Sequence, residues 1–308
     1  MPKKKLVVIG SVNADHVLQL ETFPRPGETV VGHGYQVIPG GKGANQAVAA
    51  ARLGADVSFV ACVGDDDFGT RMVERFRDDG IDTAGITTMT DMPTGIALIQ
   101  IARSGENSIA ISPEANGAFT PEILETNMAL LRKADMVLMQ LEIPLETIEV
   151  AAREARRGGA VIVLNPAPAQ PLPDSLLSDL SVITPNETEA ELLTGIRVEN
   201  ESDARNAAQV LHDKGVETVI ITLGEKGAYL SSPEGSRLVR GYEVQAVDTT
   251  AAGDTFNGAF VAALQQGRGV CAAVEFAHAA AAISVTRIGA QTSIPGIDEV
   301  NEFIKANH

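Results

Sequence analysis

The chain has 308 residues, of which 24 are Lys or Arg and 40 are Asp or Glu, so its formal net charge is −16. Hydrophobic residues make up 44% of it, which is ordinary for a folded globular protein. Because nucleic acids and anionic membranes attract cationic proteins, this charge argues against both as partners. It does not exclude small anionic ligands, since one local site can be positive on a negative protein.

The two cysteines, Cys62 and Cys271, form no CxxC pair and lie in apolar runs. We therefore expect buried free thiols in a reducing cytoplasm, and neither a disulfide nor a zinc site. The apolar stretch Leu6–Ile9, behind the Lys-rich start of the chain, is too short for the core of a signal peptide. No apolar run reaches membrane-spanning length, so we expect a soluble cytoplasmic protein.

Short apolar runs alternate with helical segments along most of the chain. Pro144–Arg157, for example, has apolar residues at helical spacing and ends at two glycines. Repeated strand–helix–strand units predict an α/β fold with three layers, a mostly parallel sheet flanked by helices on both faces. The runs that we predict as strands are Leu6–Ile9, Val57–Val63, Met136–Leu141, Ala160–Leu164, Ser181–Thr184 and Thr218–Leu223.

Two regions, at approximately 15–38 and 94–112, interrupt this rhythm with short alternating pieces. We expect them to form a small antiparallel β-sheet that serves as a lid over a substrate cleft, as a dimer interface, or as both. The chain would then be a single domain over 1–308 with two lid insertions. The pieces are His16–Leu20, Thr29–Val31, Tyr35–Ile38, Gly95–Ala102 and Asn107–Ser112.

A glycine-rich loop, Pro39–Gly43, precedes an Ala-rich helical segment. Glycines let the backbone approach a ligand closely, and the start of a helix offers unpaired N–H groups. The Asn45 amide in the first turn can hydrogen-bond a polyol, although a plain glycine turn is the alternative. The loop is not a Walker P-loop, because Gly43 follows Lys42 where Ser or Thr is required. The dinucleotide pattern GxGxxG is also absent, since Gly10–Asp15 follows the first strand.

A second segment, Asp248–Gly258, leads into a helix that we expect to begin near Ala252 or Gly253. Its small residues leave the first-turn N–H groups accessible, and with the helix dipole these form an anion site. Asp254 at that end would be a carboxylate available as a general base. Taken alone, an Asp here is more simply a helix cap. Small residues, an anion-binding helix end and a carboxylate together are what phosphoryl transfer to a hydroxyl requires.

The segments GGKGAN at Gly40–Asn45 and DTTAAGD at Asp248–Asp254 resemble the two signatures of the ribokinase-like, or PfkB-type, sugar kinases, and the similarity runs the full length of the chain. The resemblance implies an ATP-dependent enzyme that phosphorylates the 5-hydroxyl of D-ribose. Asp254 would be the general base, and backbone amides at Ala251–Gly253 would form the anion hole. The residues implied to hold the sugar are Asn13, Ala14, Asp15, Gly41, Lys42, Gly43, Ala44, Asn45, Glu142 and Asp254.

The resemblance also implies an ATP site along the carboxyl edge of the sheet. Asn186 and Glu189 are similar to the family's NxxE element, which is linked to Mg²⁺ and phosphate. Read alone, Asn186 caps a helix and Glu189 fills its first turn. His278, in an Ala-rich helix, reads alone as a packing residue. The implied ATP-site residues are Asn186, Thr222, Leu223, Gly224, Glu225, Lys226, Gly227, Gly253, Asp254 and His278.

A site for a monovalent cation, K⁺, is implied by the same resemblance. Most of its ligands would be backbone carbonyls, so side-chain identity tests this implication poorly. A bound ion beside the anion hole would act by ordering its backbone. The residues implied to form the K⁺ loop are Asp248, Thr250, Ser284, Arg287, Gly289 and Ser293.

One residue departs from the family's DTxGAGD pattern, because Ala251 stands where glycine is usual. Glycine tolerates positive φ, whereas alanine rarely adopts it. From this substitution we expect a backbone at residue 251 that does not need a positive φ.

Other functions remain open. A kinase for 2-deoxyribose or another small sugar is one alternative. Ribose and 2-deoxyribose differ by one hydroxyl, and the polar side chains of Asn13, Asp15 and Asn45 suggest a site that binds hydroxyls favourably. A non-catalytic sensor of sugars or nucleotides is an alternative from another class, and the retained Asp254 argues against it. A nicotinamide oxidoreductase is disfavoured by the missing dinucleotide pattern. The resemblance further implies a homodimer that associates through the small sheet.

Overall fold

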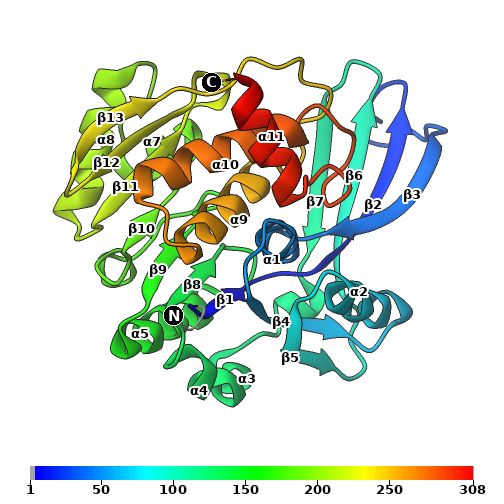
Figure 1. The fold of residues 1–308 in the computed structure, drawn as a ribbon. Coiled ribbons are helices and arrows are strands. Elements are labelled where there is room, and N and C mark those ends of the chain that lie inside the picture. Colours follow the sequence, from blue (N-terminus) through cyan, green and yellow to red (C-terminus); the bar gives the residue numbers. More distant parts are fainter. Residues whose placement is uncertain (1–3, 308) are drawn as a thin grey trace.

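A nine-stranded sheet forms the centre of the molecule (Figure 1). The computed structural model describes residues 4–307, so residues 1–3 of the Lys-rich chain start lie outside the described range. The seven neighbouring strands from β11 to β5 pair in parallel. Strand β12 runs antiparallel to both of its neighbours, β11 and β13. In spatial order the strands are β13 (Gly235–Val239), β12 (Ala228–Ser232), β11 (Thr218–Thr222), β10 (Val182–Ile183), β9 (Val161–Leu164), β8 (Met136–Met139), β1 (Leu6–Ile9), β4 (Val57–Gly64) and β5 (Asp82–Met89).

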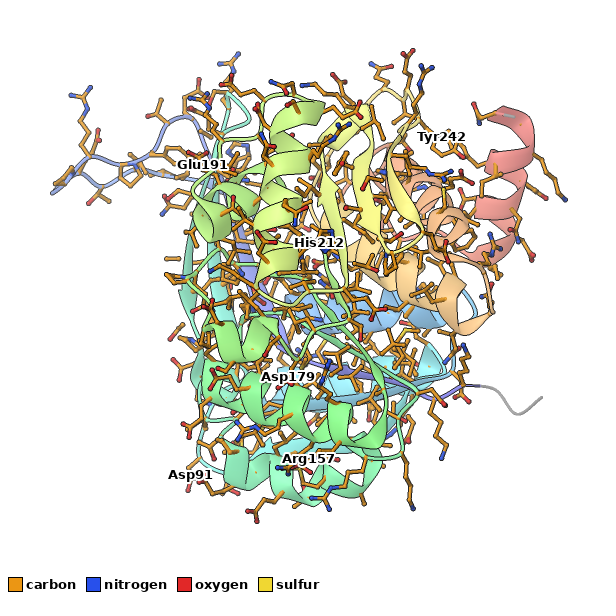
Figure 2. The ribbon with its side chains drawn as sticks, turned by 90° about the vertical axis from the view of Figure 1, so that its left-hand side faces the viewer. Asp91, Arg157, Asp179, Glu191, His212 and Tyr242 are labelled. Atoms are coloured by element: carbon orange, nitrogen blue, oxygen red, sulfur yellow. The ribbon has the colours of Figure 1, made fainter. Side chains whose placement is uncertain are left out.

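Helices cover both faces of this sheet, which confirms the predicted three-layer α/β fold. Successive residues of a strand point to opposite faces, so Leu6 and Val8 pack into one hydrophobic core while Val7 and Ile9 pack into the other. Figure 2, turned by 90° from Figure 1, shows green helices on one side of the strands and orange helices on the other.

The helices separate into two groups by the core that they cover. Those on the first core are α1 (Lys42–Arg52), α2 (Asp67–Asp78), α9 (Ala252–Gln265), α10 (Val270–Ser284) and α11 (Ile297–Asn307). Those on the second core are α3 (Pro121–Leu124), α4 (Met128–Leu131), α5 (Leu145–Gly158), α6 (Asp174–Leu177), α7 (Glu187–Thr194) and α8 (Glu201–Asp213). Short 3₁₀ turns are η1 (Glu114–Asn116), η2 (Glu125–Asn127) and η3 (Gly224–Lys226).

The small sheet is also present, with the strand order β3–β2–β6–β7, and it stands at the side of the main body in Figure 1. Its outer pairs are antiparallel as expected, but the central pair, β2 with β6, is parallel. The predicted piece Thr29–Val31 was wrong: these residues form no strand, and β3 begins at His33. The strands are β2 (Asn13–Leu20), β3 (His33–Gly40), β6 (Gly95–Ala102) and β7 (Asn107–Ser112).

Helices α1 and α9 pack unusually closely, and one glycine permits it. A Cβ atom placed on Gly258 would lie 2.5 Å from the Ala49 Cβ and 2.6 Å from the Gln46 carbonyl oxygen. Atoms cannot approach so closely, so only glycine allows this helix separation. The contact brings the first turns of α1 and α9, and with them Asn45 and Asp254, to the same place.

The two cysteines are free thiols in different surroundings. Cys62 is buried as expected, and its burial raises the pKa of the thiol to about 12. Cys271 is only partly buried, so the prediction of a second buried thiol was wrong; it lies in the first turn of α10, which reaches the surface. Within residues 4–307, none of the helices has the length and the apolar run needed to cross a bilayer.

Candidate active site

The carboxyl ends of four neighbouring parallel strands, β1, β8, β9 and β10, meet at one edge of the main sheet. Ligands of open α/β sheets bind outside such edges. A cavity of about 230 Å³ lies there, and its lining includes Lys42, Asn186, Glu189, Ala251, Gly253 and Asp254. A larger cavity, of about 430 Å³ between α2 and residues 288–292, contains only Gly289 of the predicted residues. We therefore assign the candidate active site to the smaller cavity.

Asp254 is held by α1 from across the helix contact. Its Oδ2 accepts a hydrogen bond from Asn45 Nδ2 at 2.9 Å, and its Oδ1 accepts one from Gln46 Nε2 at the same distance. The side chain is only 6% exposed, yet it lines the cavity. A carboxylate so oriented at the first turn of α9 can accept a proton from a bound hydroxyl.

The first turn of α9 begins at Ala252, as the sequence predicts. Its cap residue, Ala251, makes no side-chain hydrogen bond to the turn. The Ala252 N–H donates to the Thr249 carbonyl at 3.2 Å, whereas the Gly253 and Asp254 N–H groups of the same turn are available to an anion at the cavity. Asp254 lies in the same turn. The helix end therefore combines anion-binding amides with a carboxylate.

The expectation that residue 251 needs no positive φ was wrong. Ala251 has φ 58° and ψ 18°, in the left-handed region. Its carbonyl accepts from the Thr255 N–H at 2.8 Å, and Asp248 fixes the preceding turn by accepting from the Thr250 N–H at 2.9 Å. These contacts hold alanine in a conformation that costs about 1–2 kcal/mol, which residue type alone could not reveal.

The predicted sugar residues lie around the starts of α1 and β2. Glu142 accepts hydrogen bonds from the Ser11 hydroxyl at 2.5 Å and from the Lys42 N–H at 2.9 Å. Gly41 has φ 91° and the Ala44 N–H donates to the Ser11 carbonyl, so the loop folds back onto β1. Of the predicted sugar residues, Lys42 and Asp254 line the cavity, whereas Ala14, Gly43 and Ala44 are buried and do not line it.

Asn13 is oriented by a neighbour that the sequence did not indicate. Its Oδ1 accepts from Asn116 Nδ2 at 2.7 Å, while Asn116 Oδ1 accepts from the Val12 N–H. Since Asn116 engages the amide oxygen of Asn13, the NH₂ group of Asn13 points away from Asn116 and can donate to a ligand. Asn116 therefore supports the predicted sugar site.

Four charged groups share this region. Burial acts to lower the pKa of the Lys42 ammonium, but the surrounding carboxylates, Asp254 and Glu142 foremost, outweigh it and raise that pKa. Burial, and then the negative charges of Glu142 and Asp254, raise the pKa of Asp15 to about 7. A site in which three carboxyl groups and one ammonium group interact favours a polar ligand that donates hydrogen bonds and brings a cation.

Replacing Asp15 should change how stability depends on pH. A carboxyl group with a folded-state pKa near 7 and an unfolded value near 4 binds more protons when folded, so its stabilising contribution is present at low pH and is lost as the pH rises through 7. Without ligand, the unfolding free energy of the parent should therefore fall between pH 5 and 8 by about 2–3 kcal/mol more than that of Asp15→Asn. Urea unfolding at both pH values measures this, and equal pH dependence in the two proteins would contradict it.

The predicted nucleotide residues lie along the next strand ends. Thr222 N–H donates to the Pro185 carbonyl at 2.9 Å, which joins the end of β11 to the start of α7, and Leu223 N–H donates to the Gly227 carbonyl at 2.8 Å. Residues 223–227 thus form a tight loop, with Gly224, Glu225 and Lys226 in η3. Thr222 lines the cavity beside Asn186, so both belong to the candidate site.

Asn186 and Glu189 form a capping box at the start of α7. Asn186 Oδ1 accepts from the Glu189 N–H at 2.8 Å, and Glu189 Oε2 accepts from the Asn186 N–H at 2.9 Å. Both also line the cavity, and burial raises the pKa of Glu189. The interpretation of Asn186 and Glu189 as helix-capping residues is thus confirmed. Both also lie at the cavity that the anion-binding turn of α9 lines.

His278 lies inside the helical layer. Its ring packs edge-on against Phe256 at a centroid distance of 5.1 Å, and its burial lowers the pKa of the imidazole to about 4. It does not line the cavity that contains Asp254. His278 Nε2 is buried without a hydrogen-bond partner in the described part of the chain, so the contact with ATP that the resemblance implies stays a prediction beside its packing role.

The predicted cation residues gather where the turn before α9 meets the segment after α10. Asp248 Oδ2 accepts from the Gly289 N–H at 2.8 Å, and the Val285 carbonyl beside Ser284 accepts from the Asp248 N–H. Although burial acts to raise the pKa of Asp248, hydrogen bonds from Thr250 and Gly289 lower it. Arg287 instead turns outward to pair with Glu299, and Ser293 N–H donates to the Ala290 carbonyl.

Several residues of the site were missed by sequence reasoning. They carry amides or hydroxyls that reach the site from separate elements, so no local sequence pattern identifies them as site residues. The only signal was position, because some directly follow a strand or adjoin the glycine-rich loop. The missed residues are Ser11, Gln46, Asn116, Gln140, Asn165 and Gln291.

An open α/β sheet with a second, small sheet beside it (Figure 1), and a carboxylate beside an anion-binding helix end, define an enzyme of the small-molecule kinase class. The family model described as pfkB family carbohydrate kinase matches residues 3–297. The chain belongs to this family.

Individual relatives are similar over nearly their whole length. The chain is 53% identical to a ribokinase of Haemophilus influenzae, over 98% of this chain and 99% of that protein. It is 38% identical to a deoxyribokinase of Salmonella typhimurium, with the same coverage of both. Among solved structures, Arabidopsis thaliana ribokinase complexed with ribose and ATP superposes with a TM-score of 0.93 at 34% identity, covering 98% of this chain and 99% of that one.

Proposed function

We propose that the protein transfers the γ-phosphoryl group of ATP to the 5-hydroxyl of D-ribose. The observation that carries this proposal is the buried Asp254 carboxylate, held by Asn45 and Gln46 at the anion-binding turn of α9. The 53% identity to the Haemophilus ribokinase and the ribose and ATP in the Arabidopsis structure support ribose and ATP as substrates.

In this mechanism the sugar lies between the glycine-rich loop and α9. Asn13, Asp15 and Glu142 bind its hydroxyls, which suits carboxylates and amides because a hydroxyl both donates and accepts. Asp254 removes the proton of the attacking hydroxyl as its oxygen bonds to the γ-phosphorus, while the bond from that phosphorus to the β–γ bridging oxygen breaks and ADP leaves. The amides at Ala251–Gly253 stabilise the negative charge of the transferring phosphoryl group, and the Lys42 ammonium adds a nearby positive charge.

Mg²⁺ fits this arrangement as an ion bound mainly through substrate phosphates. Within residues 4–307 no three His, Cys, Asp or Glu side chains form a ready metal cluster. Asn186 and Glu189, however, place oxygen atoms at the cavity, and Mg²⁺ commonly uses one or two carboxylates together with phosphates. The ion would neutralise phosphate charge, while residues 222–227 would hold the nucleotide.

K⁺ fits the loop junction at Asp248, because the atoms that could coordinate a cation there are oxygen atoms of a carboxylate, of hydroxyls and of the backbone. The junction orders the same turn that presents Ala251, so a cation there would act on the anion hole through its backbone. Activity should therefore rise when K⁺ is added.

The substrate assignment is tested by comparing kcat/KM for D-ribose, 2-deoxyribose, fructose and adenosine, with and without K⁺. We expect ribose to be preferred over 2-deoxyribose by about 10-fold or more, because a site built for hydroxyls leaves polar groups unpaired with the deoxy sugar. A preference for 2-deoxyribose would instead favour the activity named for the Salmonella relative.

We further propose a homodimer that associates through the small sheet, which carries exposed large apolar side chains. The strand register puts Tyr35, Val37 and Leu98 on one face of the sheet, and Ile109 and Ile111 on the other. Large apolar side chains exposed on both faces of a small sheet favour a partner that covers it, and we take that partner to be a second copy of the chain. The proposal treats 1–308 as one kinase domain with lid insertions at 15–38 and 94–112, acting in the cytoplasm, where free cysteines persist.

A double variant, Val37→Asp with Leu98→Asp, should be monomeric, because both residues flank His16 on one face of the sheet and two buried charges per subunit oppose association. Analytical ultracentrifugation measures the mass. Val161→Asp, which alters an exposed apolar residue of the main sheet, is the control and should remain dimeric. A parent protein that sediments as a monomer would contradict the proposal.

A further inference from the structure

Gln46 is the buried centre of a side-chain network around Asp254. Its side chain is inaccessible to solvent, and Nε2 donates to Asp254 Oδ1 and to Asn165 Oδ1, both at 2.9 Å. Its Oε1 accepts from Gln140 Nε2 at 2.7 Å. Both N–H bonds of the Gln46 amide are thus used, one of them on the carboxylate.

The orientation of the Gln46 amide is fixed by a chain of hydrogen bonds that ends on the backbone. Asn165 Nδ2 donates to the Thr184 carbonyl, at 3.3 Å, and a carbonyl can only accept. Asn165 must therefore turn its Oδ1 toward Gln46, and Gln46 must turn its Nε2 toward both Asn165 and Asp254. The end of β10 thereby determines that a donor faces the base.

The unsatisfied atom of this network lies at the end away from Asp254. Gln140 Oε1 is buried without a hydrogen-bond partner in the described part of the chain. An unpaired buried acceptor costs about 1–3 kcal/mol. The hydrogen bonds on the Asp254 side of the network are therefore all formed, and the unsatisfied acceptor belongs to Gln140, which does not contact Asp254.

Gln46 differs in position from Asn45, the other donor to Asp254. Asn45 is a predicted sugar residue in the first turn of α1, and its Oδ1 accepts from Gln291 Nε2 at 3.2 Å. Gln46 does not line the cavity and contacts two residues that do, Asp254 and Asn165. Of these two, only Asp254 is proposed to take the reacting proton, so an effect of Gln46 on the chemical step acts through Asp254.

We infer that Gln46 is a positioning residue, which holds the Asp254 carboxylate in the orientation that accepts the proton of the substrate hydroxyl. The inference rests on the proposed role of Asp254 as the general base. Small displacements of a reacting group lower the rate of the chemical step strongly while leaving ground-state binding nearly unchanged. Gln46 should therefore affect kcat and leave sugar affinity almost intact.

The test is Gln46→Met, which keeps the length of the side chain and removes both donors. We expect kcat to fall about 10–100-fold, with KM for ATP and the ribose Kd, measured by titration calorimetry, changed less than about 3-fold. Gln140→Met removes an equally buried amide that does not touch Asp254, and it should lower kcat only a few-fold, since Asn165 still orients Gln46. Melting temperatures of both variants report their folding.

Gln46→Glu is a second variant of nearly unchanged shape, useful if the methionine protein folds poorly. It sets a carboxylate against Asp254, and like charges so close disturb the base, so kcat should fall at least as far as in Gln46→Met. Folded Gln46 variants with parental kcat, or an equal loss in Gln140→Met, would overturn the inference. Asp254→Asn is assayed beside them: if it retains activity, the assignment of the base itself fails, whereas an inactive Asp254→Asn with a fully active Gln46→Met removes only the positioning role.

Discussion

Asp254→Asn should lower kcat for ribose phosphorylation by about 10²–10⁴-fold, the range typical for loss of a general base. The amide keeps the shape of the side chain but cannot take the proton of the attacking hydroxyl. Ribose affinity should remain within about 5-fold of the parent, because a single hydrogen bond contributes about 1 kcal/mol. Steady-state kinetics and ribose titration calorimetry measure the two quantities.

The chain offers a matched control for the simpler interpretation of Asp254 as a helix cap. Asp203 occupies the same third position in the first turn of α8, where it stabilises the helix end and accepts from the Glu199 N–H. Asp203→Asn should lose at most about 1 kcal/mol of stability and no activity. Loss of ribose binding together with activity in Asp254→Asn would mean that its role is misassigned.

Gly258→Ala should damage both stability and catalysis, since the added Cβ would lie 2.5 Å from the Ala49 Cβ. The helices α1 and α9 must then separate, which costs about 1–3 kcal/mol of unfolding free energy. Their separation also withdraws Asn45 and Gln46 from Asp254, so kcat should fall about 10–100-fold.

Urea unfolding and steady-state kinetics test this second prediction. Gly269→Ala is the control, because a Cβ at Gly269, the cap of α10, meets no atom within 4 Å. It should leave activity unchanged and lose at most about 1 kcal/mol of stability, because alanine caps a helix less well than glycine. A Gly258→Ala protein with parental kcat would show that the helix contact does not position the base.

Local patterns were sufficient for the central layers of the fold. The buried strands β1 and β4 are continuous apolar runs, and the start of α9 follows from the small residues before Asp254. The strands β5, β12 and β13 were not predicted. They lie toward the edges of the sheet, where β13 is largely exposed and β5 has a single buried residue, and neither carries a continuous apolar run.

Relationships between distant segments could not be predicted in this way. The parallel pairing of β2 with β6 joins residues about 80 positions apart, and only the three-dimensional path of the chain determines its direction. The left-handed backbone at Ala251 is likewise imposed by contacts with Thr255 and the turn at Asp248. In the active site, the resemblance located Asp254 and Asn45, whereas the amide network through Gln46 became visible only with the strand ends in place.

The most direct test of the central claim is the position of the phosphate on the product. The protein is incubated with ATP, Mg²⁺, K⁺ and D-ribose, and phosphorus–proton correlation NMR identifies the phosphorylated carbon. We predict a single product with the phosphate on C5, formed at least about 100-fold more slowly by Asp254→Asn. A phosphate on another carbon, or release of ADP without any phosphorylated sugar, would contradict the account.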